Sequence, residues 1–354
     1  KASIEVLSYS PSRGIEETLD ALVTYYTDCG IELSADKLLV TIGGSESFVF
    51  ALQITCDVGD EILIPEPFYP NYKGQAAVNG VRVVPITTHV EDGFHLPSLE
   101  EMESLVTPRT RAVLFSNPAN PTGVGYTRDE MERIARLSLE HDLFVISDEP
   151  YRELMYDGEA VSVLSLPELR DRAILVDSIS KRLSACGARI GCLASHNSNV
   201  IAAANKLGQI RLSPPTFSQY GLIAFLNDPS YKAEIAKIAE KFERRRDTLF
   251  EALQTIPGVC CRKPEGAFYI FVKFPQIDDS EEFAKFLLDD FSYQGETVML
   301  APGAGFYATE GKGLDEVRIA YVLEEPKLVR AVEVLKAGLE AYVAQRDQVV
   351  ASAG

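Results

Sequence analysis

The segment SISKRLSACGARIG, residues 178–191, places a lysine and an arginine directly after an apolar run that is typical of a buried strand. Lys181 lies eight residues before Arg189, and Ser178 and Ser180 precede the lysine. A lysine in apolar surroundings can act as a nucleophile, and an arginine can bind a phosphate through two parallel hydrogen bonds. The segment therefore predicts a site that binds a phosphate and uses an amine.

A second segment, TIGGSES at residues 41–47, follows another apolar run and opens a predicted helix. The glycines allow a tight turn, and the amides of Gly44, Ser45 and Glu46 would point outward from the N-terminus of the helix. Such amides form a site for an anion. The alternative is an ordinary turn with a helix cap.

Two more strand ends carry polar residues. SNPANPTG (116–123) contains two prolines, so it is neither a helix nor an inner strand, and it could hold Asn120 in one orientation. ISDEPY (146–151) places Asp148 at the end of an apolar strand, where a buried carboxylate needs a cationic partner. The alternative for Asp148 is a capping residue.

An arginine stands among apolar residues in VRIAY (317–321). Arg318 could bind an anionic group of a ligand there, and a structural ion pair is the alternative. Because ligands of open α/β sheets bind at the carboxyl ends of the strands, we expect the strand-end residues described above to share one site.

Together these side chains match the functional groups of pyridoxal 5'-phosphate. Arg189 and the helix amides would meet its phosphate, Lys181 its aldehyde, Asn120 and Tyr151 an oxygen, and Asp148 its basic ring nitrogen. A lysine joined to the aldehyde and an acidic partner for the ring nitrogen are what proteins contribute to this cofactor. The sequence therefore predicts a site for pyridoxal 5'-phosphate.

Apolar runs of strand length alternate with amphipathic segments through the first two thirds of the chain. This alternation predicts an α/β fold with a three-layer α/β/α large domain and a mostly parallel sheet. The expected strands are residues 37–43, 61–66, 81–87, 111–117, 143–149, 173–179 and 189–195, and the expected helices include 16–30, 96–106 and 127–142. The last two strands are too close for a helix between them, so one should be antiparallel to its neighbour.

The pattern changes after residues 212–219, where a long charged helix is expected over 229–256. A smaller α+β C-terminal domain should follow. Its expected strands are 266–274, 297–303 and 316–322, and its expected helices are 281–291 and 326–345. We place the domain boundary inside the long helix, which divides the chain into a cofactor-binding domain at 1–246 and a small domain at 247–354.

Composition excludes some classes of partner. The chain has 354 residues and a net charge of -18, which disfavours binding to nucleic acid or to anionic lipid. Its apolar runs have strand length, and none approaches the roughly 20 residues of a membrane span. The six cysteines include no C-x-x-C pair. We expect a cytoplasmic protein with reduced thiols and no metal site.

The motifs taken together resemble those of fold-type I, class I/II pyridoxal-phosphate aminotransferases, the aspartate aminotransferase superfamily. The resemblance extends from about residue 8 to about residue 345. It includes, in the family's order, YSPSRG, GGSES, PFYPNY, NPANPTG, SDEPY, SISKRLSACGARIG and VRIAY. Each motif is weak by itself, and the ordered set with its lysine-to-arginine spacing is specific.

The resemblance implies roles for the residues of the cofactor site. Lys181 would be the Schiff-base lysine and would move protons, and Asp148 would keep the ring nitrogen protonated. Asn120 and Tyr151 would bond the ring oxygen. The phosphate would be held by Gly44, Ser45, Ser178 and Arg189.

Further roles follow from the same resemblance. Tyr69 matches the residue whose ring stacks on the cofactor, with Phe68 as the nearby competitor. Arg318, together with Asn120, would bind the α-carboxylate of the substrate. Tyr9 would reach the phosphate of the partner subunit in a homodimer with shared active sites. Arg211 could bind a distal carboxylate across that dimer.

The implied reaction is transfer of an amino group from an L-amino acid, with aspartate as the leading candidate, to a 2-keto acid such as 2-oxoglutarate. A carbon–sulfur β-lyase on the same scaffold would share every residue named. A ligand-sensing aminotransferase-like domain would bring a basic DNA-binding segment, and a nicotinamide dehydrogenase would need G-x-G-x-x-G after the first strand.

The family also has an N-terminal arm before the Tyr9 motif, which we expect this chain to lack.

Overall fold

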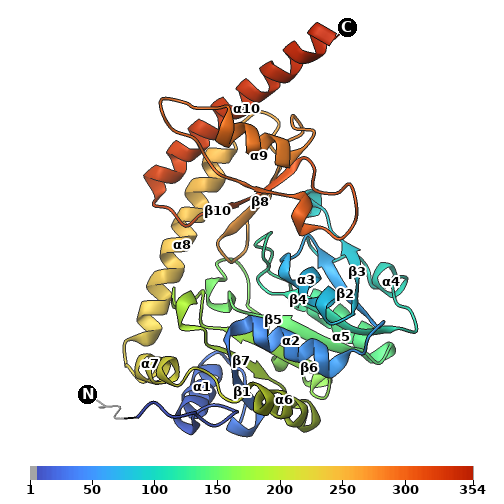
Figure 1. The fold of residues 1–354 in the computed structure, drawn as a ribbon, viewed down its shortest axis with the longest axis vertical. Helices are drawn as coiled ribbons and strands as arrows, with labels where there is room; N and C mark the ends of the chain where they lie inside the picture. The colour runs from blue at the N-terminus through green and yellow to red at the C-terminus, as the bar shows by residue number, and fades with distance from the viewer. Residues whose placement is uncertain (1–5, 354) are drawn as a thin grey trace.

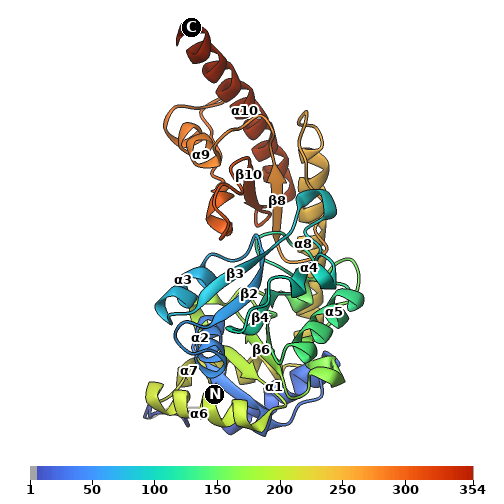
Figure 2. The ribbon, with the colours of Figure 1, turned by 90° about the vertical axis from the view of Figure 1, so that its right-hand side faces the viewer.

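The computed structural model describes residues 6–353. A large domain built on a seven-stranded sheet lies at one end, and a C-terminal domain with a three-stranded sheet lies at the other (Figures 1 and 2). The helix α8 (Tyr231–Leu253) runs from the large domain to the C-terminal domain (Figure 1). The α/β fold with an additional C-terminal domain is confirmed.

Seven strands form the sheet of the large domain in the order β1-β7-β6-β5-β4-β2-β3. They are β1 (Leu38–Thr41), β2 (Glu61–Glu66), β3 (Arg82–Thr87), β4 (Thr110–Ser116), β5 (Phe144–Asp148), β6 (Ala173–Ser178) and β7 (Gly191–Ala194). The pairs from β3 to β6 are parallel. β7 is antiparallel to both β6 and β1. The predicted mostly parallel sheet and its antiparallel final strand are both confirmed.

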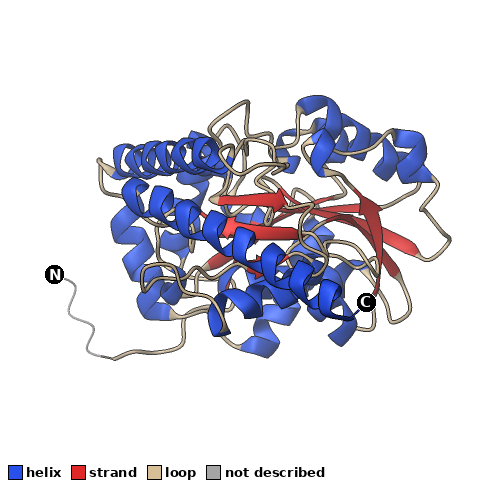
Figure 3. Cartoon of the chain, turned by 90° about the horizontal axis from the view of Figure 1, so that it is seen from above, coloured by secondary structure: helices blue, strands red, loops and turns tan. Residues whose placement is uncertain are grey.

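Apolar side chains alternate between the two faces of this sheet, and both faces are buried. In β2, Ile62 and Ile64 join one apolar core and Leu63 joins the other. This period of two is what a strand covered on both faces requires. The first core contains residues of α2 (Gly43–Thr55), α3 (Asn71–Val78) and α6 (Ser198–Arg211), and the second contains residues of α1 (Glu16–Asp28), α4 (Leu99–Glu103), α5 (Arg128–Glu140) and α7 (Thr216–Leu226). Figure 3 shows the strands between the helices.

The C-terminal domain has an antiparallel sheet in the order β8-β10-β9. Its elements are β8 (Tyr269–Lys273), α9 (Ser280–Asp289), β9 (Ala301–Pro302), β10 (Glu316–Ala320) and α10 (Glu325–Ala353). A separate apolar core joins β8 and β10 to α9, α10 and the second half of α8. The proposed domain boundary at 246/247 falls within α8, which has no break there.

Two elements have less than half of the length that the sequence predicts. The strand expected over 297–303 is reduced to the two residues of β9, because only Ala301 and Pro302 pair with β10. The apolar side chains of Val298 and Leu300 instead pack against the core without a ladder partner. The helix expected over 96–106 is only α4, because a capping box at Ser98 starts it late.

Among the described residues, no helix combines the length and the apolar character that crossing a membrane requires.

An ionic clamp attaches the loop before α4 to both domains. His95 Nδ1 lies 3.0 Å from Glu130 Oε2 in α5, and His95 Nε2 lies 3.8 Å from Glu265 Oε1 near the start of the C-terminal sheet. The Glu265 carboxylate also accepts a bond from Gly125 N over 3.3 Å. Hydrogen bonds to Glu130 and then to Glu265 raise the pKa of His95 to about 10.

The clamp predicts a pH-dependent contribution to stability. Because the folded pKa of His95 lies above its ordinary value of 6.5, protonation favours the folded state, fully below pH 6.5 and decreasingly as pH rises through 10. Replacing His95 by glutamine should therefore lower the free energy of unfolding more at pH 6 than at pH 10. Urea unfolding of both proteins across this range measures the difference, and a difference that does not change with pH would contradict the clamp.

Candidate active site

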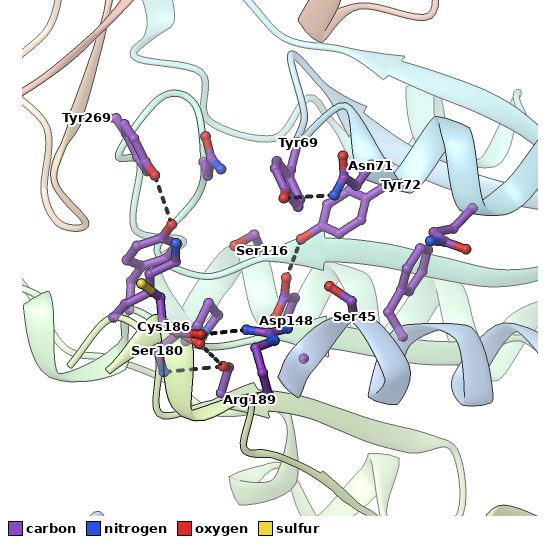
Figure 4. Close-up of a pocket in the computed structure, with 18 of the residues that line it drawn as sticks. Ser45, Tyr69, Asn71, Tyr72, Ser116, Asp148, Ser180, Cys186, Arg189 and Tyr269 are labelled. Atoms are coloured by element: carbon purple, nitrogen blue, oxygen red, sulfur yellow. Dashed lines mark hydrogen bonds between the residues drawn. The ribbon is translucent and has the colours of Figure 1, made fainter. Parts of the chain in front are cut away.

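Strand ends bring the predicted residues together in a cavity of about 330 Å³. β1, β4, β5 and β6 end at the same edge of the sheet, and the antiparallel β7 begins there. All predicted site residues except Tyr9 and Arg211 line this cavity. Figure 4 shows several of the lining side chains pointing toward one another.

One end of the cavity offers groups that suit a phosphate. Gly44 and Ser45 lie in the first turn of α2, whose amides have no helical partner. A Cβ at Gly43 would overlap the guanidinium of Arg189, so the glycine lets Arg189 lie against the start of α2. Ser178 Oγ donates to Ser180 Oγ over 2.8 Å. Backbone amides, hydroxyls and a guanidinium are the donors that anion binding requires.

Asp148 lies at the end of β5 and accepts a hydrogen bond from Tyr72 Oη over 2.5 Å (Figure 4). Burial raises the pKa of Asp148 to about 7, although the Tyr72 bond lowers it. The nearby carboxylates of Asp177 and Glu149 raise this pKa further, and Lys181 lowers it. A carboxyl group in this state lacks a strong cationic partner and would gain one from a protonated ring nitrogen.

Arg318 reaches the cavity from the C-terminal domain. Its guanidinium carbon lies 4.5 Å from the ring centre of Tyr269 and 5.0 Å from that of Phe306. Arg318 Nη1 donates to Asn120 Oδ1 over 2.9 Å. Its Nε is buried and has no hydrogen-bond partner within residues 6–353. Arg318 is therefore oriented from three sides and retains unused capacity to bind an anion.

Lys181 projects from the loop after β6 toward aromatic side chains. Its Nζ lies 5.9 Å from the ring centre of Phe268. In the part of the chain that the structure describes, no hydrogen bond or ion pair holds this amine. The amine is therefore available for a reaction in the cavity. Nearby, Tyr151 Oη donates to Tyr269 Oη over 3.2 Å.

A buried ion cluster lies directly beneath the loop that carries Lys181. Asp177 accepts bonds from Arg182 Nη1 and Nη2 over 2.8 and 2.9 Å, and from Tyr26 Oη over 2.7 Å. Burial alone would raise the pKa of Asp177, but the guanidinium groups of Arg182 and Arg152 hold it well below its usual value. Asp177 Oδ1 also accepts a bond from the amide of Ser178 over 2.7 Å. The cluster thus anchors the backbone from which the loop that carries Lys181 begins.

Two predicted site residues lie outside the cavity. Tyr9 is 81% exposed. Arg211 donates from Nη2 to Ser12 O over 2.9 Å, and its Nη1 lies 3.6 Å from Glu46 Oε2. These contacts within its own chain give no support to a role for Arg211 in binding a distal carboxylate, which stays a prediction. Of the two residues that compete for the stacking role, Tyr69 lines the cavity and Phe68 does not.

Sequence reasoning missed Tyr72, Tyr269 and Cys186, which also line the cavity. Tyr72 was within reach, since PFYPNY places it three residues after Tyr69 at the start of a helix. Tyr269 begins a strand of the C-terminal domain, and nothing in the sequence indicates which face of that strand meets the large domain. Cys186 follows Lys181 in a loop whose path is not set by any periodic pattern.

Comparison with known proteins agrees with this geometry. Residues 1–335 match the family model described as aminotransferase class I and II. The chain is 32% identical to the aspartate aminotransferase of Bacillus subtilis (strain 168), over 94% of this chain and 84% of that protein. It is 34% identical to the probable aspartate/prephenate aminotransferase of Aquifex aeolicus (strain VF5), over 94% of this chain and 83% of that protein.

A solved structure with a similar fold is the aromatic aminotransferase from Pyrococcus horikoshii OT3. It matches with a TM-score of 0.86 and 31% identity, over 96% of this chain and 88% of that chain. The chain therefore belongs to the class I and II aminotransferase family. The family resemblance seen in the sequence motifs is confirmed.

Removing the Tyr72 hydroxyl should change the acidity of Asp148. Because the Tyr72 bond lowers the pKa of Asp148, Tyr72→Phe should raise it above about 7 in the cofactor-free protein. Carboxyl-carbon NMR of protein labelled at aspartate Cγ measures this titration. Tyr151→Phe is the matched control, since Tyr151 Oη donates to Tyr269 rather than to Asp148. An unchanged pKa in Tyr72→Phe would show that the bond does not govern the carboxyl group.

Proposed function

We propose that the chain transfers an amino group from an L-amino acid to a 2-keto acid with pyridoxal 5'-phosphate as its cofactor. Aspartate and 2-oxoglutarate are the proposed substrates, consistent with the aspartate aminotransferases among its relatives. The observation that carries the proposal is the convergence of Lys181, Asp148, Arg189 and Arg318 on one cavity. An amine, an acid and two guanidinium groups are the groups that the cofactor and an amino acid together require.

Three features of the cavity support this cofactor. Asp148 is a buried carboxyl group with a raised pKa, which a protonated ring nitrogen would stabilise as the anion. The first turn of α2 and Arg189 form an anion site that a side chain at Gly43 would obstruct. Arg318 has a buried Nε without a partner among the described residues, so its guanidinium can still donate to a substrate carboxylate. The donors and acceptors that line the cavity therefore fit pyridoxal 5'-phosphate.

When bound, the cofactor would supply an electron sink for the α-carbon of the amino acid. Lys181 Nζ would take the proton from that carbon, because no bond among the described residues holds the amine elsewhere. Asp148 would keep a proton on the ring nitrogen. Arg318 and Asn120 would bind the α-carboxylate and so orient the α-hydrogen toward Lys181.

Product analysis tests this function against the β-lyase alternative. Purified protein incubated with L-aspartate, 2-oxoglutarate and the cofactor should form glutamate in proportion to the aspartate consumed. The reaction should require the keto acid and release no ammonia. Ammonia and pyruvate released from cysteine-type substrates without any keto acid would instead establish a lyase.

We further propose that two chains form a homodimer and that Tyr9 acts in the partner's site. The segment around Tyr9 packs on the start of α7, where Thr216 Oγ1 donates to Ser8 O over 3.2 Å. Tyr9 is 81% exposed and does not line the cavity of its own chain. Ile210 and Phe217, from the neighbouring helices, are 80% and 72% exposed. Burial of these exposed apolar side chains against a second chain would support the proposed interface.

Mixed dimers test the shared site. Lys181→Ala and Tyr9→Ala homodimers should both be impaired, the lysine variant almost completely. In a two-fold symmetric mixed dimer, the chain that keeps Lys181 receives an intact Tyr9 from its partner, so a random equal mixture should recover about a quarter of normal site activity. Activity after confirmed subunit exchange is the measurement. No recovery would show that Tyr9 acts in its own chain or not at all.

A further inference from the structure

A buried carboxylate connects the large domain to a loop of the C-terminal domain. Glu66 ends β2 and is fully buried, with 0% of its surface exposed. Its Oε2 accepts bonds from the amides of Ala308 and Thr309 over 2.9 and 3.1 Å. Its Oε1 accepts bonds from the hydroxyls of Thr309 and Thr87 over 2.6 and 3.1 Å. Three of these four donors belong to the C-terminal domain, so the carboxylate acts as a latch between domains.

The loop that Glu66 holds is also the loop that supports Arg318. Phe306, two residues before Ala308, is buried, and its ring centre lies 5.0 Å from the guanidinium carbon of Arg318. Phe306 O accepts a bond from Phe68 N of the large domain over 2.8 Å. Both contacts with the large domain come from the end of β2 and the residues just after it, because Glu66 is the last residue of β2 and Phe68 follows two residues later.

The position of Arg318 depends on both domains at once. Its backbone belongs to β10 of the C-terminal domain, and its Nη1 donates to Asn120 of the large domain. The ring of Phe306 covers one side of its guanidinium. If the loop moved away from β2, Phe306 would move with it, and Arg318 would lose the surface that holds it over the cavity.

We propose that Glu66 is a positioning residue for Arg318. By binding the amides of Ala308 and Thr309, Glu66 fixes Phe306, and Phe306 fixes the guanidinium that receives the substrate's α-carboxylate. The role of Arg318 in this statement rests on the proposed function. A buried carboxylate that satisfies two backbone amides is costly to replace by an apolar group, because the amides would stay buried without an acceptor.

Substitutions at Glu66 distinguish this role from general support of the fold. Glu66→Met removes the acceptor and should raise KM for L-aspartate and for 2-oxoglutarate by about tenfold, since bonds to a charged group are strong. The kcat should change much less, because Arg318 binds the α-carboxylate in ground state and transition state alike. Glu66→Gln should restore most of the affinity, since its amide can turn its oxygen to the two backbone amides and its NH₂ group to the two hydroxyls.

Two threonines give matched variants of the same hydrogen-bonded group. Thr309→Val removes the hydroxyl bond from the C-terminal loop and should raise KM a few-fold. This variant replaces Glu66→Met in the test if Glu66→Met does not fold. Thr87→Val removes one bond to the same carboxylate from within the large domain and should leave KM unchanged. Hydrogen exchange of the Ala308 and Thr309 amides in the holoenzyme should be faster in Glu66→Met and unchanged in Thr87→Val.

The outcomes separate the latch from the proposed function. If the wild-type protein transfers no amino group, the proposed function fails, and calorimetric binding of 2-oxoglutarate to the holoenzyme still tests the latch without turnover. A weaker Kd for 2-oxoglutarate in Glu66→Met, restored in Glu66→Gln, supports the positioning role. Faster amide exchange with an unchanged Kd and KM would overturn it, as would an equal loss of affinity in Thr87→Val.

Discussion

The direction of the strands is the constraint on which the active site depends. β1, β4, β5 and β6 run in the same sense, so the polar residues that follow them meet at one edge of the sheet. The antiparallel β7 begins at that edge, and the short turn after Lys181 can therefore return Arg189 to the same cavity. A helical crossover between β6 and β7 would have made these strands parallel and separated the two residues.

A buried ion cluster then holds this edge in place. Asp177 binds two guanidinium groups and the amide of Ser178, directly before the loop that carries Lys181. Breaking such a pair leaves an uncompensated buried charge, which costs about 3–5 kcal/mol. The backbone before Lys181 is thus held in place, while the Nζ of Lys181 stays available. Arg318 is supported differently, from a second domain, through Asn120 and the loop held by Glu66.

Much of the lining of this cavity could be predicted from the sequence, because each strand is a recognisable apolar run and the candidate site residues stand at or just after its end. Lys181, Asp148 and Asn120 are examples. Contacts between distant segments could not be predicted: the bond from Tyr72 to Asp148 and the bonds from Ala308 and Thr309 to Glu66 join residues that no local pattern relates. The shortening of β9 has the same origin, since pairing depends on which residues of β10 face it.

We propose that Lys181 is the residue that bonds to pyridoxal 5'-phosphate in this cavity. Borohydride reduction of the cofactor-loaded protein, followed by peptide mapping with mass spectrometry, identifies the lysine involved. We expect the cofactor to be fixed to the peptide containing Lys181, with no other lysine labelled. A label on a different lysine, or no label in a protein that retains the cofactor, would show that Lys181 does not bond to the cofactor.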